Sequence, residues 1–108
     1  MIVVTTETVE GRRVARTLGL VRGNTIRSRH VGRDLLAVFR MLVGGEISEY
    51  TKLMAEAREQ ALDRLVEDAQ SLGADAVVAV RFETAMVASG AAELLAYGTA
   101  VALADAGN

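Results

Sequence analysis

The chain has 108 residues, of which 51% are apolar and 24% are charged, and its net charge is −2. This length suits one domain with one hydrophobic core, and the composition excludes a disordered chain. There is no cysteine and only one histidine, which excludes disulfides, thiolate metal ligands and cysteine nucleophiles. The N-terminus has no signal-peptide pattern, and no apolar run reaches the roughly 18 residues that a membrane helix needs. We therefore expect a single cytoplasmic domain with an ordered core over residues 1–104 and a tail over residues 105–108.

The first quarter of the chain has the residue pattern of strands. A β-branched run predicts a short strand over residues 2–6, and Glu10–Gly11 predicts a turn. A longer strand is predicted over residues 12–26, interrupted by Gly19 and Gly23. Glycine inside a strand often marks a bulge or the close approach of another backbone.

The middle of the chain changes to a helical period. After a polar loop at residues 27–30, apolar residues recur every three or four positions over residues 31–43, and Gly44–Gly45 ends that predicted helix. A second, longer helix is predicted over residues 46–72 and is ended by Gly73. Such a helix is about 40 Å long. Because this is long for so small a domain, we expect part of its apolar face to pack against another subunit.

The last third returns to strands. Two antiparallel strands are predicted over residues 75–86 and 91–103, joined by a turn at residues 88–90. In the first, Ala76, Val78, Val80, Phe82 and Met86 are predicted to share one face. Gly98, in the middle of the second, indicates close backbone approach. Strands at both ends with a helical middle predict an α+β fold with the helices on one face of an antiparallel sheet.

Short segments spread in order along nearly the whole chain resemble those of one protein family. The strongest are Leu72–Val78 and Gly98–Val101. The others are Thr5–Thr6, Glu10–Gly11, Gly23, Ile26, Arg33–Asp34, Arg40, Val43–Gly45, Tyr50, Ala57–Arg58 and Ala61. In these segments the chain resembles the YbjQ family, small bacterial and archaeal proteins of unknown function that are labelled as heavy-metal-binding domains.

The resemblance implies a particular subunit and assembly. The subunit would be dodecin-like, with a β-α-β-β core, a three-stranded antiparallel sheet and an extra short N-terminal strand used in assembly. The assembly would be a homopentameric ring, and the expected source is bacterial.

The heavy-metal label has little support in the residues. Soft metals prefer thiolate or imidazole ligands. Because the chain has no cysteine and one histidine, His30 is the only residue that could supply such a ligand. One histidine cannot build a site within a subunit, although a ring could gather several copies of it near its axis. We interpret His30 as a solvated loop residue, interpret the acidic residues of the helices as a solvated face, and expect no metal and no cofactor.

Arginines and carboxylates are the better candidates for a site. Arg33, Asp34 and Arg40 lie on the first predicted helix and Arg58 on the second. Arginine and carboxylate groups form planar, bidentate pairs that suit interfaces. We expect interhelical or intersubunit ion pairs, such as Arg58 with Asp34 or with Asp75, and keep anion or small-ligand binding as the alternative.

Charge divides unequally along the chain. Residues 1–45 carry eight basic and three acidic residues, a net charge of +5, whereas residues 46–108 carry four basic and eleven acidic residues, a net charge of −7. This pattern favours complementary contacts between neighbouring subunits. A basic surface for RNA or DNA is disfavoured because few aromatic side chains are present to stack on bases. Those present are all predicted to be buried: Phe39, Tyr50, Phe82 and Tyr97.

The sequence therefore predicts a homo-oligomeric ring with a structural or small-ligand-binding role and no catalysis. Its partners would be further copies of itself and an unidentified small ligand, with no membrane association. Gly44, Gly45, Gly73 and Gly98 are assigned structural roles, and Tyr50 is assigned to packing. Two alternatives remain open, a metal-binding protein and an enzyme whose arginine and carboxylate groups meet at a subunit interface.

Overall fold

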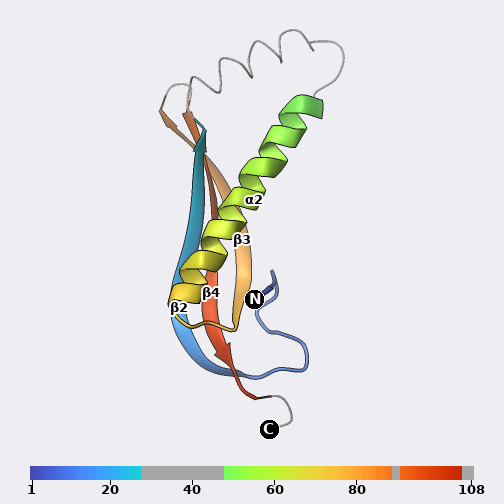
Figure 1. The fold of residues 1–108 in the computed structure, drawn as a ribbon, viewed down its shortest axis with the longest axis vertical. Helices are drawn as coiled ribbons and strands as arrows, with labels where there is room; N and C mark the ends of the chain where they lie inside the picture. Colours follow the sequence, from blue (N-terminus) through green and yellow to red (C-terminus); the bar gives the residue numbers. More distant parts are fainter. Residues whose placement is uncertain (28–47, 89–90, 106–108) are drawn as a thin grey trace.

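The computed structural model describes residues 1–27, 48–88 and 91–105. In chain order these form β1 (Ile2–Val3), β2 (Val14–Arg27), α2 (Ser48–Ser71), β3 (Ala76–Ala88) and β4 (Ala91–Leu103). The strands make one sheet in the order β1-β3-β4-β2, in which β1 runs parallel to β3 and the other neighbours are antiparallel. α2 runs along one face of this sheet (Figure 1).

The α+β class predicted from the sequence is confirmed, and the sheet differs in one respect. It has four strands and is mixed, because β1 pairs with β3 of its own chain. The assembly role implied for this strand, like the other dodecin-like details, stays a prediction. The predicted helix over residues 31–43 lies outside the described residues.

A line of small side chains seats α2 on the sheet. Ala57, Ala61, Leu65 and Ala69 recur every four residues and are each no more than 1% exposed, as one face of an amphipathic helix requires. The last three form the main core with residues of the three long strands: Val21 of β2, Val77 and Val80 of β3, and Ala96 and Ala100 of β4. The second helix predicted from the sequence is therefore confirmed, with Ser71 as its last residue instead of Leu72; residues 46 and 47 lie outside the described residues.

The contact between α2 and β2 is a backbone contact. A Cβ atom added at Gly23 would lie closer than 3.0 Å to the carbonyl oxygen of Ala61 and to the amide nitrogen of Leu65. Two residues further along β2, the Thr25 hydroxyl donates to the carbonyl oxygen of Ala57 at 3.2 Å. The close approach that glycine in this strand predicted is thus the approach of α2.

A β-bulge in β3 reverses which residues face α2. The register moves from Val78↔Thr99 to Arg81↔Tyr97, so two β3 residues face one residue of β4. Ala79 has a φ of +55°, a left-handed conformation that alanine rarely adopts. The bulge also puts a close contact at Gly98, where an added Cβ would lie 2.8 Å from Val77 Cγ1 and 2.9 Å from the Val78 carbonyl oxygen.

The bulge makes part of the predicted alternation wrong. Val77 and Val80 both pack on the α2 side, whereas Ala76 and Val78 belong to a second cluster. Phe82, predicted to be buried, is 41% exposed, because α2 packs mainly on β2 and β4 and scarcely reaches β3. No residue pattern marks this bulge, since its left-handed position is an alanine and not a glycine.

β2 also contains a bulge, and in this strand a glycine, Gly19, marks its position. The register shifts between Thr17 and Gly19, where φ is +131°. This is the interruption that the sequence predicted within the strand.

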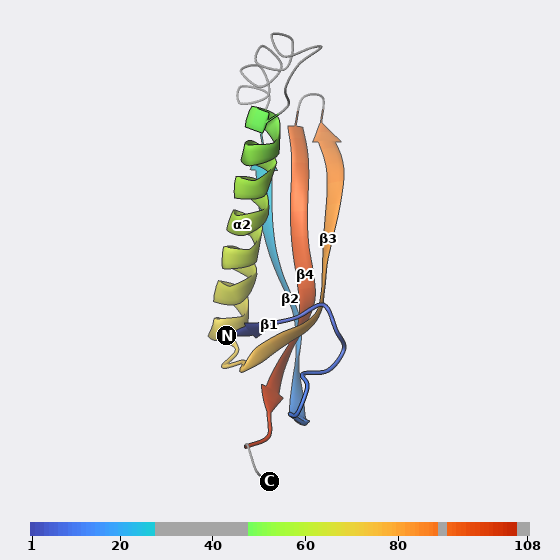
Figure 2. The same cartoon turned by 90° about the vertical axis from the view of Figure 1, so that its right-hand side faces the viewer.

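The segment after β1 covers the lower part of the face opposite α2. Val4 donates its amide to Val77 O at 3.0 Å and accepts from the Val80 amide at 3.1 Å. Val4 and Val9 then pack on the second apolar cluster, formed by residues at the start of β3 and the end of β4. Figure 2 shows α2 on one side of the sheet and this segment looping out on the other side. The predicted turn at Glu10–Gly11 is confirmed, with a φ of +75° at the glycine.

Candidate functional site

Beyond the N-terminal segment, no element among the described residues covers the face of the sheet turned away from α2. On β2, Val21, Gly23 and Thr25 contact α2, and because side chains alternate along a strand, the residues between them point the other way. The same holds on β4, where Ala96 and Ala100 lie in the α2-side core. We call the uncovered surface the open face. Its residues are Leu20, Arg22, Asn24 and Ile26 of β2, Arg81 and Glu83 of β3, and Glu93, Leu95, Tyr97 and Thr99 of β4.

Two large apolar side chains stand out on the open face. Leu20 is 69% exposed and Ile26 is 55% exposed, although both belong to a strand whose other face is fully buried at Val21. Burying such a side chain is worth about 1.5–3 kcal/mol. Both lie on the same face of β2, about 20 Å apart along the strand, and we take them as two candidate contact points on that face.

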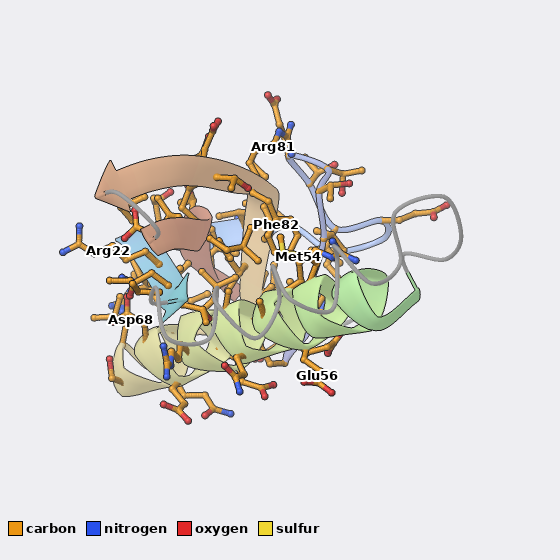
Figure 3. All side chains as sticks on the ribbon, turned by 90° about the horizontal axis from the view of Figure 1, so that it is seen from above. Arg22, Met54, Glu56, Asp68, Arg81 and Phe82 are labelled. Atoms are coloured by element: carbon orange, nitrogen blue, oxygen red, sulfur yellow. The ribbon has the colours of Figure 1, made fainter. Side chains whose placement is uncertain are left out.

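Cross-strand pairing arranges the open face in rows. Arg22 pairs with Tyr97, and Arg81 pairs with the same tyrosine from the other side, so the two arginines are the cross-strand neighbours of one tyrosine. At one strand spacing per step the two arginines are about 10 Å apart. Figure 3 shows Arg81 extending away from α2 and Arg22 extending from the edge strand. The row has the donors to bind carboxylates or phosphates.

Neighbouring groups fix parts of this surface. Arg81 Nη1 donates to the carbonyl oxygens of Thr5 at 2.8 Å and Val80 at 2.9 Å. In the rows beyond, Asn24 Nδ2 donates to Glu93 Oε2 at 3.1 Å. One of the two acidic groups of the open face, Glu93, therefore already has a partner.

Side chains of α2 cap the free edge of β2. The amide of Arg22 donates to Asp68 Oδ2 at 3.1 Å, and Arg64 Nη1 donates to the carbonyl oxygen of Asn24. An exposed strand edge otherwise invites pairing with another chain. Because these groups are occupied at the centre of β2, the open face is a better contact surface than this edge.

Asp75, one of the predicted site residues, has a structural role within the chain. Its Oδ2 atom accepts the amide of Leu103 at 2.8 Å, and its own amide donates to the carbonyl oxygen of Val101 at 2.9 Å. Its carbonyl oxygen also accepts the amide of Ile2 at 3.4 Å. Asp75 thereby joins the ends of β1, β3 and β4.

Replacing Asp75 with alanine is expected to destabilise the chain by about 1–2 kcal/mol, because the nearly buried amide of Leu103 loses its acceptor. Asp75→Asn keeps an acceptor oxygen and is expected to recover most of the loss. Urea unfolding of the two variants measures this difference. Equal stability of the alanine variant and the wild type would show that the hydrogen bond does not hold these strand ends.

Arg58 does not meet Asp75 within one chain. Arg58 is exposed on α2, and the thirteen residues from it to the end of the helix at Ser71 span about 20 Å. Among the residues that the structure describes, it makes no hydrogen bond or ion pair. A contact between Arg58 and a carboxylate of another subunit stays a prediction.

Two of the predicted structural glycines are seen in those roles. Gly73 follows α2 with a φ of +73°, the left-handed conformation that ends helices, and Gly98 lies at the close contact described above. For Tyr50 only the backbone, within α2, is described. The remaining predicted site residues lie outside the described residues: His30, Arg33, Asp34, Arg40, Gly44 and Gly45.

Neither a metal-binding cluster nor a membrane-spanning helix is found in the described ranges. There, no three histidine, cysteine, aspartate or glutamate side chains are grouped so that they could hold a metal ion. Nor does any helix in those ranges combine the length and the apolar character needed to cross a bilayer.

The arginine row was missed by reasoning from the sequence. None of the site residues proposed from the sequence lies within β2 or β3, the strands that carry Leu20, Ile26 and Arg81. The available signal was that β2 carries apolar residues on both of its faces, with Val21 on one and Leu20 on the other. The register that places Arg22 and Arg81 on either side of Tyr97 depends on the bulge at Ala79, which the sequence does not mark.

Residues 1–104 match the YbjQ family, which is described as "Putative heavy-metal-binding", and the chain belongs to this family. UPF0145 proteins of Methanosarcina acetivorans and Clostridioides difficile are each 56% identical to it, over 94% and 97% of this chain and 95% and 94% of their own. A UPF0145 protein of Archaeoglobus fulgidus is 58% identical over 95% of both chains. These relatives are archaeal as well as bacterial, so the similarity does not support the expected bacterial source.

A solved structure shares the fold. A protein of unknown function from Pediococcus pentosaceus, assigned to the DUF74 family, aligns with a TM-score of 0.66 over 96% of this chain and 98% of its own. The sequence identity is 14%, so the likeness concerns the fold alone.

Proposed function

We propose that the chain is a non-catalytic subunit of a homo-oligomeric ring with a structural or small-ligand-binding role. The observation that carries this proposal is the open face, on which Leu20 and Ile26 are more than half exposed. A second copy would bury both side chains and stabilise the assembly by removing their apolar surface from water. A ring of five copies is the number that the family resemblance implied.

The shape of the chain supports the same proposal. Its Cα radius of gyration is 17.4 Å and its principal extents are 58 × 26 × 16 Å. A compact domain of about 100 residues has a radius of gyration of about 13 Å. A slab this long and thin exposes more surface than a self-sufficient domain of its size, and association with further copies would cover part of it.

A variant with Leu20→Asp and Ile26→Asp tests the proposal. Size-exclusion chromatography coupled to light scattering is expected to give the mass of several subunits for the wild type at micromolar concentration. The variant is expected to have a lower mass and unchanged far-UV circular dichroism, because both positions are exposed in one chain. Ile2→Asp, also at an exposed isoleucine but on the opposite edge strand, is the matched control. A monomeric wild type would overturn the proposal.

Metal binding is the second candidate, and the family description favours it. Since the sequence has no cysteine and one histidine, a site for a soft metal would need His30 from several copies of the chain. Metal analysis of the purified protein by plasma mass spectrometry tests this. We expect less than one equivalent of zinc, copper or nickel per ring, and a stoichiometric, chelator-sensitive metal that is lost in His30→Ala would establish this candidate instead.

A further inference from the structure

The outer side of α2 carries a ridge of carboxylates. Its four residues are spaced by three, four and four positions, which places them on one side of the helix, and all are exposed: Glu56, Glu59, Asp63 and Glu67. They lie opposite the buried stripe that seats α2 on the sheet, and Figure 3 shows Glu56 extending from that outer side. We call this surface the acidic ridge.

Within one chain the acidic ridge weakens its helix. Glu59, Asp63 and Glu67 follow one another at four-residue intervals, and like charges at that spacing destabilise a helix by a few tenths of a kcal/mol per pair. Of the nearest arginines on α2, Arg64 is engaged at the edge of β2. A cationic surface from outside the chain would therefore relieve this repulsion.

The arginine row of the open face has matching dimensions. Arg22 and Arg81 are about 10 Å apart across the sheet, and Glu59 and Glu67 are about 12 Å apart along the helix. Apolar surface matches as well, because the half-buried Leu62 and Val66 border the ridge on α2 and could cover the exposed Leu20 and Ile26.

We propose that the acidic ridge of one copy docks on the open face of the next copy, with its carboxylates on Arg22 and Arg81. This inference rests on the proposed function and names the two surfaces that meet. The contact is heterologous, because each copy offers a different surface to each neighbour, and a heterologous contact closes into a ring when its rotation permits.

Charge argues against the two symmetric contacts. An open face docked on another open face would place the arginine rows against each other, and a ridge docked on a ridge would do the same with carboxylates. Like charges brought together at an interface cost several kcal/mol. Only the contact between unlike surfaces brings the arginines of one copy to the carboxylates of the ridge of the other.

Nucleic acid is the competing occupant of the arginine row. Among the residues that the structure describes, Tyr97 is the only aromatic side chain on the open face, and two carboxylates, Glu83 and Glu93, lie on the same face. A surface that binds single-stranded nucleic acid combines a continuous positive groove with several stacking aromatics. The open face therefore fits a protein surface that is locally acidic better than it fits a polyanion.

Charge reversal tests the contact. The face variant carries Arg22→Glu and Arg81→Glu, the ridge variant carries Glu59→Arg and Glu67→Arg, and a combined variant carries all four changes. A control variant with Arg13→Glu and Arg16→Glu has the same change in net charge as the face variant, at exposed positions near the start of β2 that lie off the open face. Each is analysed by native mass spectrometry and by sedimentation over a range of concentrations.

Each two-residue variant is expected to dissociate, with an apparent dissociation constant raised about 100-fold or more. The combined variant is expected to recover the wild-type mass, and the control variant to keep it. Because Arg81 also holds Thr5, the face variant could lose folded structure. The ridge variant changes no intrachain contact of the described residues. Its dissociation alone is therefore sufficient to test the contact.

The outcomes separate this contact from the ring proposal. If the wild type assembles and the ridge variant assembles equally well, the contact is wrong while the ring proposal stands. Dissociation of both variants without recovery in the combined variant would also overturn the contact. A monomeric wild type would overturn the ring proposal itself. If the wild type instead copurifies with nucleic acid that the face variant lacks, the open face belongs to nucleic acid and the inference fails.

Discussion

Gly23→Ala is expected to destabilise the chain by about 3 kcal/mol and to lower its Tm by more than about 10 °C. The new methyl group would press on the carbonyl oxygen of Ala61 and the amide nitrogen of Leu65. Both are backbone atoms of α2, so no side chain can rotate away and the whole helix must move off the sheet. That movement would loosen the core between α2 and β2.

Thermal and urea unfolding of the Gly23→Ala variant measures the effect, at one protein concentration because association adds to apparent stability. Thr17→Ala, at an exposed position of the same strand, is the control and is expected to change stability by no more than about 0.5 kcal/mol. If the glycine variant is as stable as the control, α2 does not approach β2 as closely as described.

Leu65→Ala is expected to cost about 3 kcal/mol. Leu65 is fully buried, is among the largest fully buried side chains of the described residues, and contacts the core formed by β2, β3 and β4. Truncation would leave a cavity in a cluster whose other buried members are alanines and valines, and these short side chains reach little of it. The loss should therefore appear in full.

Leu72→Ala is the matched control, because it makes the same substitution one residue beyond α2 at a side chain that is 45% exposed. We expect its midpoint of urea unfolding to stay close to that of the wild type and that of Leu65→Ala to fall, with similar slopes for both. A smaller loss for Leu65→Ala than for Leu72→Ala would contradict the placement of the core under α2.

Periodicity predicted the helices and strands well where one face is buried. The four-residue recurrence from Ala57 to Ala69 is strong because alanine and leucine both fit the helix and the sheet beneath it. The glycines were equally informative, since Gly23 and Gly98 lie where backbones nearly touch and Gly73 has a left-handed φ that other residues rarely adopt.

The failures have one physical origin. The bulge at Ala79 shifts the alternation of β3 by one residue, so that Val80 and Phe82 lie on a different face from Ala76 and Val78. Alternation can be counted along a strand only while the register is regular. Because the bulge occupies an alanine, the sequence offers no residue by which to locate it.

The candidate site depended on long-range pairing and could be predicted only in outline. The unequal charge of the two halves indicated self-association, but the positions of the charges required the sheet register. Arg22 and Arg81 are 59 positions apart in the sequence and become neighbours of Tyr97 only through β4. Asp75 shows the converse, since a residue proposed for an interface forms hydrogen bonds between strand ends of its own chain.

The mass of the wild-type protein under native conditions tests the ring most directly. The proposal predicts one dominant species containing five chains of 11.5 kDa each at micromolar concentration, stable to moderate dilution. A species of one chain at that concentration would contradict it, because the open face would then be exposed to water in the working protein.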